Sequence, residues 1–102
     1  MSTELIEKLK IARECTDEAS LFNLCQSHEP AVALEIARSK NATIRVLDLL
    51  TRHTSIVVRH AVALNPNVSS ETLKRLCRDK DQLVRDYARR SLLKRQDNPQ
   101  SV

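Results

Sequence analysis

The chain has 102 residues, a formal net charge of +4, three cysteines and no glycine. Because glycine supplies the positive φ angles of tight hairpins and phosphate-binding loops, its absence argues against Rossmann turns and P-loops. The aromatic residues are Phe22 and Tyr87, which leaves few platforms for stacking the bases of a single-stranded nucleic acid.

The cysteines and the hydropathy bear on where the protein works. An odd number of widely spaced cysteines without a signal peptide is typical of free thiols in a reducing cytosol. No apolar run approaches the ~20 residues that a membrane span needs. We therefore expect a cytoplasmic protein with no membrane partner.

Amphipathic periodicity predicts seven helices along the chain. In chain order they cover residues 3–15, 17–27, 30–39, 43–53, 55–64, 69–78 and 81–95. The first, with Leu5, Ile6, Leu9 and Ala12 facing inward, is expected to cap one end of the fold, and the last to cap the other. Residues 96–102 are polar and are expected to form a disordered tail.

Short polar residues mark the beginning of three of these helices. Asp17, Thr43 and Ser69 are spaced 26 residues apart, and their side-chain oxygens suit the N-cap position. Asn65-Pro66 is expected to end the helix over 55–64, because the residue before a proline disfavours the α region.

Apolar residues repeat with the same 26-residue period, as at Leu21, Leu47 and Leu73. Self-similarity of this kind is typical of a solenoid, in which each unit buries its apolar face against its neighbours. We predict an all-α fold, a short α-solenoid of stacked helix pairs, as a single domain over residues 1–95. Its expected parts are a capping helix over 3–15 and repeat units over 17–42, 43–68 and 69–95.

One stretch carries a fuller pattern. It runs Val58-Arg59, an apolar helix, Asn65-Pro66, a capped leucine helix, an aspartate-bearing turn over 79–81, and then valine-arginine again. This pattern resembles the leucine-rich repeat variant family, with the best agreement over residues 56–90. The resemblance implies a HEAT- or armadillo-like solenoid that binds proteins, peptides or nucleic-acid backbones along one side. It implies no reaction, and the iron–sulfur cysteine cluster of some members is not matched, so no cofactor is expected.

Arginines at equivalent positions form the strongest candidate binding surface. Arg59 and Arg85 are 26 residues apart, as are Arg52 and Arg78. The planar guanidinium fork suits carboxylate and phosphate groups. The candidate partner-binding residues are Arg52, Arg59, Arg78, Arg85, Arg89, Arg90 and Lys94. For Arg59 and Arg85 the alternative is a structural clamp to an aspartate of the turn over 79–81.

The other reactive side chains lack the partner residues that a metal site or a catalytic site needs. Cys25 and His28 are three residues apart, but a structural zinc site usually has two such pairs, and no second pair exists. Glu35 is the one acid on an otherwise apolar helix face. We favour a structural role, in which it reaches water or a neighbouring arginine such as Arg59 or Arg38, over a catalytic one. We expect no catalytic residue, no metal site and no enzymatic activity.

The charge is unevenly distributed along the chain. Residues 1–51 carry a net −2, whereas residues 52–102 carry +6. Such asymmetry favours an acidic partner for the C-terminal half. We therefore expect a protein-interaction module, an adaptor or inhibitor, that binds an acidic protein through an arginine-lined side. The alternative is binding of a nucleic-acid backbone by the basic C-terminal half, and the oligomeric state, monomer or dimer, stays open.

Overall fold

Helices make up the whole regular structure of the described residues. The computed structural model describes residues 3–26 and 29–97, and within these ranges it contains seven α-helices and no strand. They are α1 (Thr3–Glu14), α2 (Glu18–Cys25), α3 (Pro30–Ala37), α4 (Ile44–Leu50), α5 (Ile56–Leu64), α6 (Ser70–Leu76) and α7 (Gln82–Asp97). Residues 96–97, predicted as the start of a disordered tail, belong to α7; the rest of that predicted tail lies outside the described residues.

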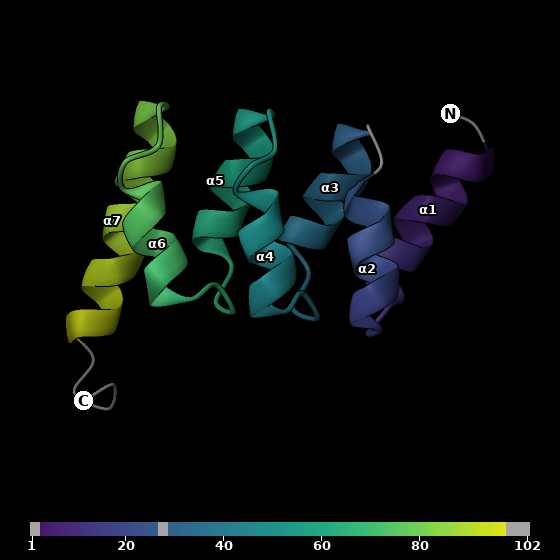
Figure 1. The fold of residues 1–102 in the computed structure, drawn as a ribbon, viewed down its shortest axis with the longest axis horizontal. Coiled ribbons are helices and arrows are strands. Elements are labelled where there is room, and N and C mark those ends of the chain that lie inside the picture. Colours follow the sequence, from purple (N-terminus) through teal and green to yellow (C-terminus); the bar gives the residue numbers. More distant parts are fainter. Residues whose placement is uncertain (1–2, 27–28, 98–102) are drawn as a thin grey trace.

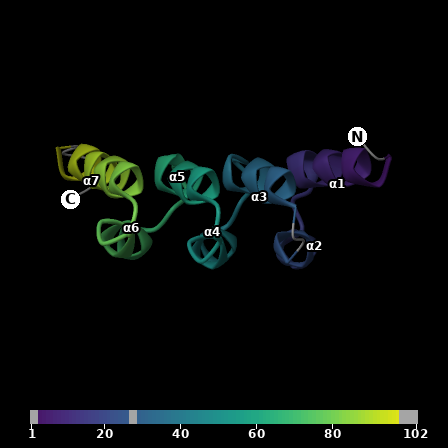
Figure 2. The ribbon, with the colours of Figure 1, turned by 90° about the horizontal axis from the view of Figure 1, so that it is seen from above.

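The helices form two layers. Helices α1, α3, α5 and α7 lie side by side in one layer, and α2, α4 and α6 lie in the other (Figure 2). The array is elongated, with extents of 45 × 28 × 18 Å, and α1 and α7 are at its opposite ends (Figure 1). Each helix of the longer layer packs on the next one in that layer. The predicted all-α solenoid of stacked helix pairs is confirmed.

The helix boundaries follow the local chemistry of the sequence. The side chains of Asp17, Thr43 and Ser69 each accept a hydrogen bond from the backbone amide three residues on, as predicted for N-caps. Ser55 caps α5 in the same way, which the sequence analysis did not predict. At the other end, α5 stops at Leu64 before the asparagine-proline pair.

The core is built from the predicted ladders. Leu21, Leu47 and Leu73 are all fully buried. In α1, Ala12 is buried, but Ile6 is 52% exposed, so its predicted inward position is wrong. Successive residues of an α-helix are separated by about 100°, and Ile6 is therefore turned away from the inward face at i, i+4 and i+7 from residue 5.

Two asparagines in the α5–α6 turn bind this turn to the unit before it. Asn65 Nδ2 donates to the carbonyls of Ala37 at 2.8 Å and Ser39 at 2.9 Å. Asn67 Nδ2 donates to two carbonyls of the α3–α4 turn, within residues 40–42. These side chains satisfy carbonyls at the end of α3 in a chain that has no glycine to form the usual C-cap.

Helix α7 makes the equivalent bonds with different side chains. Ser91, one repeat after Asn65, donates to the carbonyl of Ala63 at 2.7 Å. Arg95 donates to the carbonyls of Pro66 at 3.4 Å and Val68 at 2.5 Å, one repeat after those that Asn67 binds. Arg95 therefore belongs to the bonding between units, although it stands in the basic end of the chain.

Candidate partner-binding surfaces

Arg59 is an internal clamp. It is 3% exposed; its Nε lies 2.9 Å from Asp79 Oδ2, and its Nη1 donates to the carbonyls of His53 at 2.8 Å and Thr54 at 3.0 Å. A partner cannot reach this guanidinium without opening the contact between α5 and the α6–α7 turn. The prediction that Arg59 binds a partner is therefore wrong, and the clamp, which was its alternative, is what the side chain forms.

Arg85, the equivalent residue of α7, uses only part of its hydrogen-bonding capacity inside the fold. Its Nη1 donates to the carbonyl of Asp79 at 2.7 Å, and the side chain is half-buried. Among the described residues, no carboxylate pairs with its guanidinium.

The remaining predicted cations are exposed but do not share one side of the molecule. Arg52 and Arg78 follow α4 and α6 in one layer, whereas Arg89, Arg90 and Lys94 lie on α7 in the other (Figure 2). Arg52 and Arg78 have no ion-pair partner in the described part of the chain. The arginines thus occupy at least two separate surfaces.

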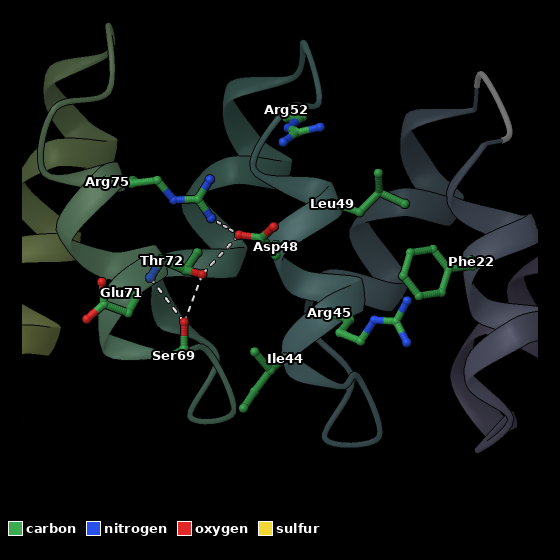
Figure 3. A pocket seen from close by; sticks show the side chains of 10 residues that line it. All are labelled: Phe22, Ile44, Arg45, Asp48, Leu49, Arg52, Ser69, Glu71, Thr72 and Arg75. Atoms are coloured by element: carbon green, nitrogen blue, oxygen red, sulfur yellow. Dashed lines mark hydrogen bonds and ion pairs between the residues drawn. The ribbon is translucent and has the colours of Figure 1, made fainter.

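A groove of about 370 Å³ lies between α4 and α6 (Figure 3). Arg75 and Thr72 both point to Asp48, which forms an ion pair with the first and accepts a hydrogen bond from the second at 3.2 Å. Arg45 pairs with Glu18 across 3.4 Å. Its guanidinium also lies over the Phe22 ring, 5.6 Å from the centroid. Arg45 and Arg75 are therefore paired internally, whereas Arg52, which also lines the groove, has no ion-pair partner in the described part of the chain.

The outer side of the other layer is apolar at its centre. On α5, Ile56, Val57 and Leu64 are 45%, 57% and 51% exposed, and Leu83 of α7 is 51% exposed. Val57 and Leu64, with Leu34 of α3, line a hollow of about 390 Å³ that has His60 in its wall. We call this surface, with Ile56, Val57, His60, Leu64 and Leu83, the α5 face.

Polar groups border the α5 face. The Nε2 atom of His60 is buried and has no hydrogen-bond partner within the described residues, and its ring packs edge-to-face on Tyr87 with centroids 4.3 Å apart. Arg38, the C-cap residue of α3, and Arg90 of α7 are at positions equivalent to Leu64, one repeat before and after it, and both are exposed. Neither has a carboxylate partner among the described residues, while Arg90 lies over the Tyr87 ring at 5.5 Å.

The two acids near this face are already paired. Glu35 lies 3.4 Å from Arg13 of α1, and this contact corrects the predicted pairing with Arg59 or Arg38. Asp86 lies 3.8 Å from Arg89. The electrostatic character of the border is therefore set by Arg38 and Arg90.

Sequence reasoning did not find the α5 face, although a signal was present. Val57 and Leu64 are seven residues apart, which places them on one side of a helix. The inward residues Val58, Ala61 and Val62 already account for the core-facing stripe. Two further large apolar residues on another side are therefore an excess that a core does not need.

No metal or nucleophile site emerges from the described residues. They contain no group of three or more His, Cys, Asp or Glu side chains placed to hold a metal ion, and His28 of the considered Cys25–His28 pair lies outside them. Burial raises the pKa of the Cys25 thiol to about 11, which disfavours the thiolate that a nucleophile needs. Within the same residues, no helix combines the length and apolar character needed to cross a membrane.

The comparison with known proteins agrees with this geometry. Residues 56–81, from the start of α5 to the turn before α7, match the family model described as leucine rich repeat variant. No curated protein and no solved structure matches the chain. The match confirms the resemblance read from the sequence, and a repeat family of this kind supports a protein-interaction module rather than an enzyme.

Proposed function

We propose that this chain, which carries a leucine-rich repeat variant unit over residues 56–81, is a non-enzymatic protein-interaction module of the adaptor or inhibitor kind. Its partner is a protein segment with apolar residues flanked by carboxylates, and the segment binds the α5 face. The observation that carries the proposal is the group of exposed apolar side chains on α5 and α7 between the unpaired cations Arg38 and Arg90.

The apolar centre supplies the affinity in this proposal. Large side chains that are half exposed and adjacent to one another are unusual on a monomer and are typical of interaction sites. Covering them yields roughly 25 cal/mol for each Å² of apolar surface removed from water, before the cost of association is subtracted. Val57 and Leu64, on either side of the hollow, are the expected anchors.

The border supplies the sign of the partner's charge. Arg38 and Arg90 can each form a two-bonded contact with a carboxylate, and neither must leave an internal carboxylate to do so. Arg89 and Lys94 on α7 add to the positive potential that steers an acidic partner during encounter. Arg52 and Arg78 lie in the other layer, so they stay a separate predicted contact.

His60 adds a polar contact inside the apolar centre. A buried ring nitrogen without a partner costs free energy, and a neutral imidazole nitrogen can either donate or accept a hydrogen bond. A polar group of the partner that reaches Nε2 satisfies this atom. Binding would then depend on the chemistry of one group as well as on apolar area.

A site-specific photo-crosslinker at position 64 tests the proposal in native lysate treated with nuclease. We expect a nuclease-resistant crosslinked protein, lost in Val57→Asp and in Arg38→Glu/Arg90→Glu. The matched control is the same crosslinker at Leu49, in the groove between α4 and α6, which should capture much less of that protein. Equal capture at both positions, or survival in the Val57→Asp variant, would contradict the proposal.

Nuclease-sensitive capture would instead favour the alternative, binding of a nucleic-acid backbone by the basic C-terminal half. That alternative draws its support from the net +6 of residues 52–102. It gives no role to the exposed apolar side chains of α5, because phosphate contacts are made by cations.

A further inference from the structure

The repeat provides an internal template for the binding chemistry of Arg85. The Nη1 atom of Arg59 donates to the carbonyl of His53, and the Nη1 atom of Arg85 donates to the carbonyl of Asp79. Both the donor and the acceptor of the second bond are one repeat after those of the first. The two guanidiniums therefore share one equivalent hydrogen bond within their units. In both residues this bond uses Nη1 and leaves the Nε–Nη2 edge for another ligand.

In α5 this edge has a known ligand. The Nε and Nη2 atoms of Arg59 donate to the two carboxylate oxygens of Asp79, at 2.9 and 3.3 Å, and the carboxylate comes from the turn of the following unit. At Arg85, one repeat on, no described residue supplies the corresponding carboxylate. Helix α7 runs on to Asp97, through the positions at which α5 gives way to its asparagine-proline turn.

The surface around Arg85 is suited to an acidic ligand rather than to another apolar unit. Arg89 is one helical turn further along α7 and is exposed, whereas its equivalent in α5, Ala63, is 1% exposed beneath α7. A guanidinium thus stands where an internal unit has a small apolar residue. Residues four apart on a helix share one side, so α7 presents both arginines together, with Arg89 in an exposed ion pair with Asp86 at 3.8 Å.

We propose that the Nε–Nη2 edge of Arg85, with Arg89 beside it, is a receptor for an aspartate or glutamate carboxylate of a partner protein. The carboxylate comes from a turn that packs on α7 as the α6–α7 turn packs on α5. This receptor is at the end of the array, whereas the α5 face is on its outer side. The inference depends on the Arg59–Asp79 template and does not require the proposed function.

The Arg59–Asp79 pair also explains why residue 85 must be an arginine to bind a carboxylate in this way. A planar fork donates two parallel hydrogen bonds to one carboxylate, and a lysine ammonium keeps the charge but loses that geometry. Half-burial of Arg85 reduces the screening of its charge by water relative to the exposed arginines of this chain. Arg52 and Arg78 are therefore suitable controls, because they carry the same charge but do not make the hydrogen bond that Arg85 shares with Arg59.

The test uses a synthetic peptide with the sequence of residues 78–86, which contains the Asp79 turn. The peptide is titrated into the isotope-labelled protein while the side-chain Nε–Hε signals of the arginines are followed by NMR. We expect the Arg85 signal to shift in a saturable way and those of Arg52 and Arg78 to change little. A peptide with Asp79→Asn and Asp81→Asn should not shift the Arg85 signal.

Variants complete the test. Arg85→Lys should raise the dissociation constant of the peptide by about tenfold or more at unchanged helix content, whereas Arg52→Lys and Val57→Asp should leave it unchanged. Equal shifts at Arg52 and Arg85, or undiminished binding by Arg85→Lys, would overturn the inference. A short DNA duplex or inorganic phosphate that shifts Arg85 at lower concentration than the peptide would overturn the choice of a protein carboxylate as the ligand.

Discussion

The carboxylate of Asp79, in the turn before α7, accepts hydrogen bonds from Nε and Nη2 of Arg59 on α5, and both side chains are less than a tenth exposed. The pair joins the turn of one unit to the helix of the unit before it. The guanidinium also donates to two carbonyls before α5, so its donors are used on both sides. One arginine thus connects the residues just before α5, α5 itself and the turn of the following unit.

Replacing Arg59 by alanine should therefore destabilise the fold severely. The change removes the cation that pairs with a buried carboxylate, which then keeps only its hydrogen bond from the backbone amide of Asp81, and it leaves two carbonyls without this donor. We therefore expect a loss of roughly 3–5 kcal/mol in the free energy of unfolding, measured by urea denaturation. The matched control, Arg52→Ala, removes an exposed arginine and should change stability by no more than about 0.5 kcal/mol. The double variant Arg59→Ala/Asp79→Ala should cost less than the sum of its parts, and full additivity would argue against a coupled pair.

The asparagine bonds give a second stability test. Asn65→Asp keeps the shape of the side chain but replaces the donating amide with a carboxylate, which faces the carbonyls of Ala37 and Ser39. We expect a loss of at least roughly 1–3 kcal/mol, the cost of leaving buried polar groups unpaired. Asn41→Asp is the control, since the side chain of Asn41 makes no hydrogen bond within the described residues. Similar urea midpoints for the two variants would contradict this role of Asn65.

The leucine ladder sets the third test. Leu47→Ala and Leu73→Ala remove buried methyl groups from fully buried positions and should each cost roughly 2–5 kcal/mol. Leu64→Ala, on the exposed α5 face, should change the unfolding free energy by no more than about 0.5 kcal/mol. A midpoint shift near zero for either core variant would show that the inward side of the units has been misassigned.

The architecture could be predicted from the sequence because it depends on local and periodic signals. Capping side chains, the proline after Asn65 and the 26-residue leucine ladder each act within one unit or between neighbouring units. The inward position predicted for Ile6 failed because the repeat has no equivalent for α1. Without a second copy of that helix to compare, its side chains had to be assigned from one amphipathic pattern.

The candidate site was harder to predict because equivalent residues differ in their surroundings. Arg59 and Arg85 have the same place in the repeat, yet Arg59 meets the aspartate of a following unit and Arg85 does not. Whether a cation is free depends on such contacts between units. The α5 face was missed for a related reason: Val57 and Leu64 increase the apolar content of α5 without taking part in its core.

Cys25 supplies a prediction about pH. Burial raises the pKa of its thiol from 9.0 to about 11, so the folded state holds this proton more tightly than the unfolded chain does. The resulting stabilisation is fully present below about pH 9 and is lost as the pH rises towards about 11. The urea midpoint of the native protein should therefore fall more steeply over this range than that of Cys25→Ala. Parallel pH profiles of the two proteins would contradict this role of the Cys25 thiol.

The reactivity of the thiols gives a related test. Near pH 8, iodoacetamide should modify Cys25 more slowly than the half-buried Cys15 and Cys77.

The final prediction separates a protein partner from a nucleic-acid partner through the salt dependence of binding. If the basic C-terminal half binds duplex DNA, the logarithm of the binding constant should fall with the logarithm of salt concentration, with a slope of about −0.9 for each phosphate neutralised. Arg89→Ala/Arg90→Ala should then make that slope shallower, whereas Val57→Asp should have little effect.

If the α5 face binds an acidic protein segment, as we propose, Val57→Asp should have the large effect on binding and the arginine variants the smaller one. Val57→Asp abolishes binding, because a carboxylate enters the apolar centre and faces a partner of the same charge. Arg90→Ala reduces the association rate and its salt dependence, since border charges act mainly on encounter. DNA binding, measured by fluorescence anisotropy, should then be weak and largely lost near about 150 mM salt, where charges more than ~8 Å apart are screened. Tight duplex binding at that salt concentration, abolished by Arg89→Ala/Arg90→Ala and insensitive to Val57→Asp, would reverse the choice of partner.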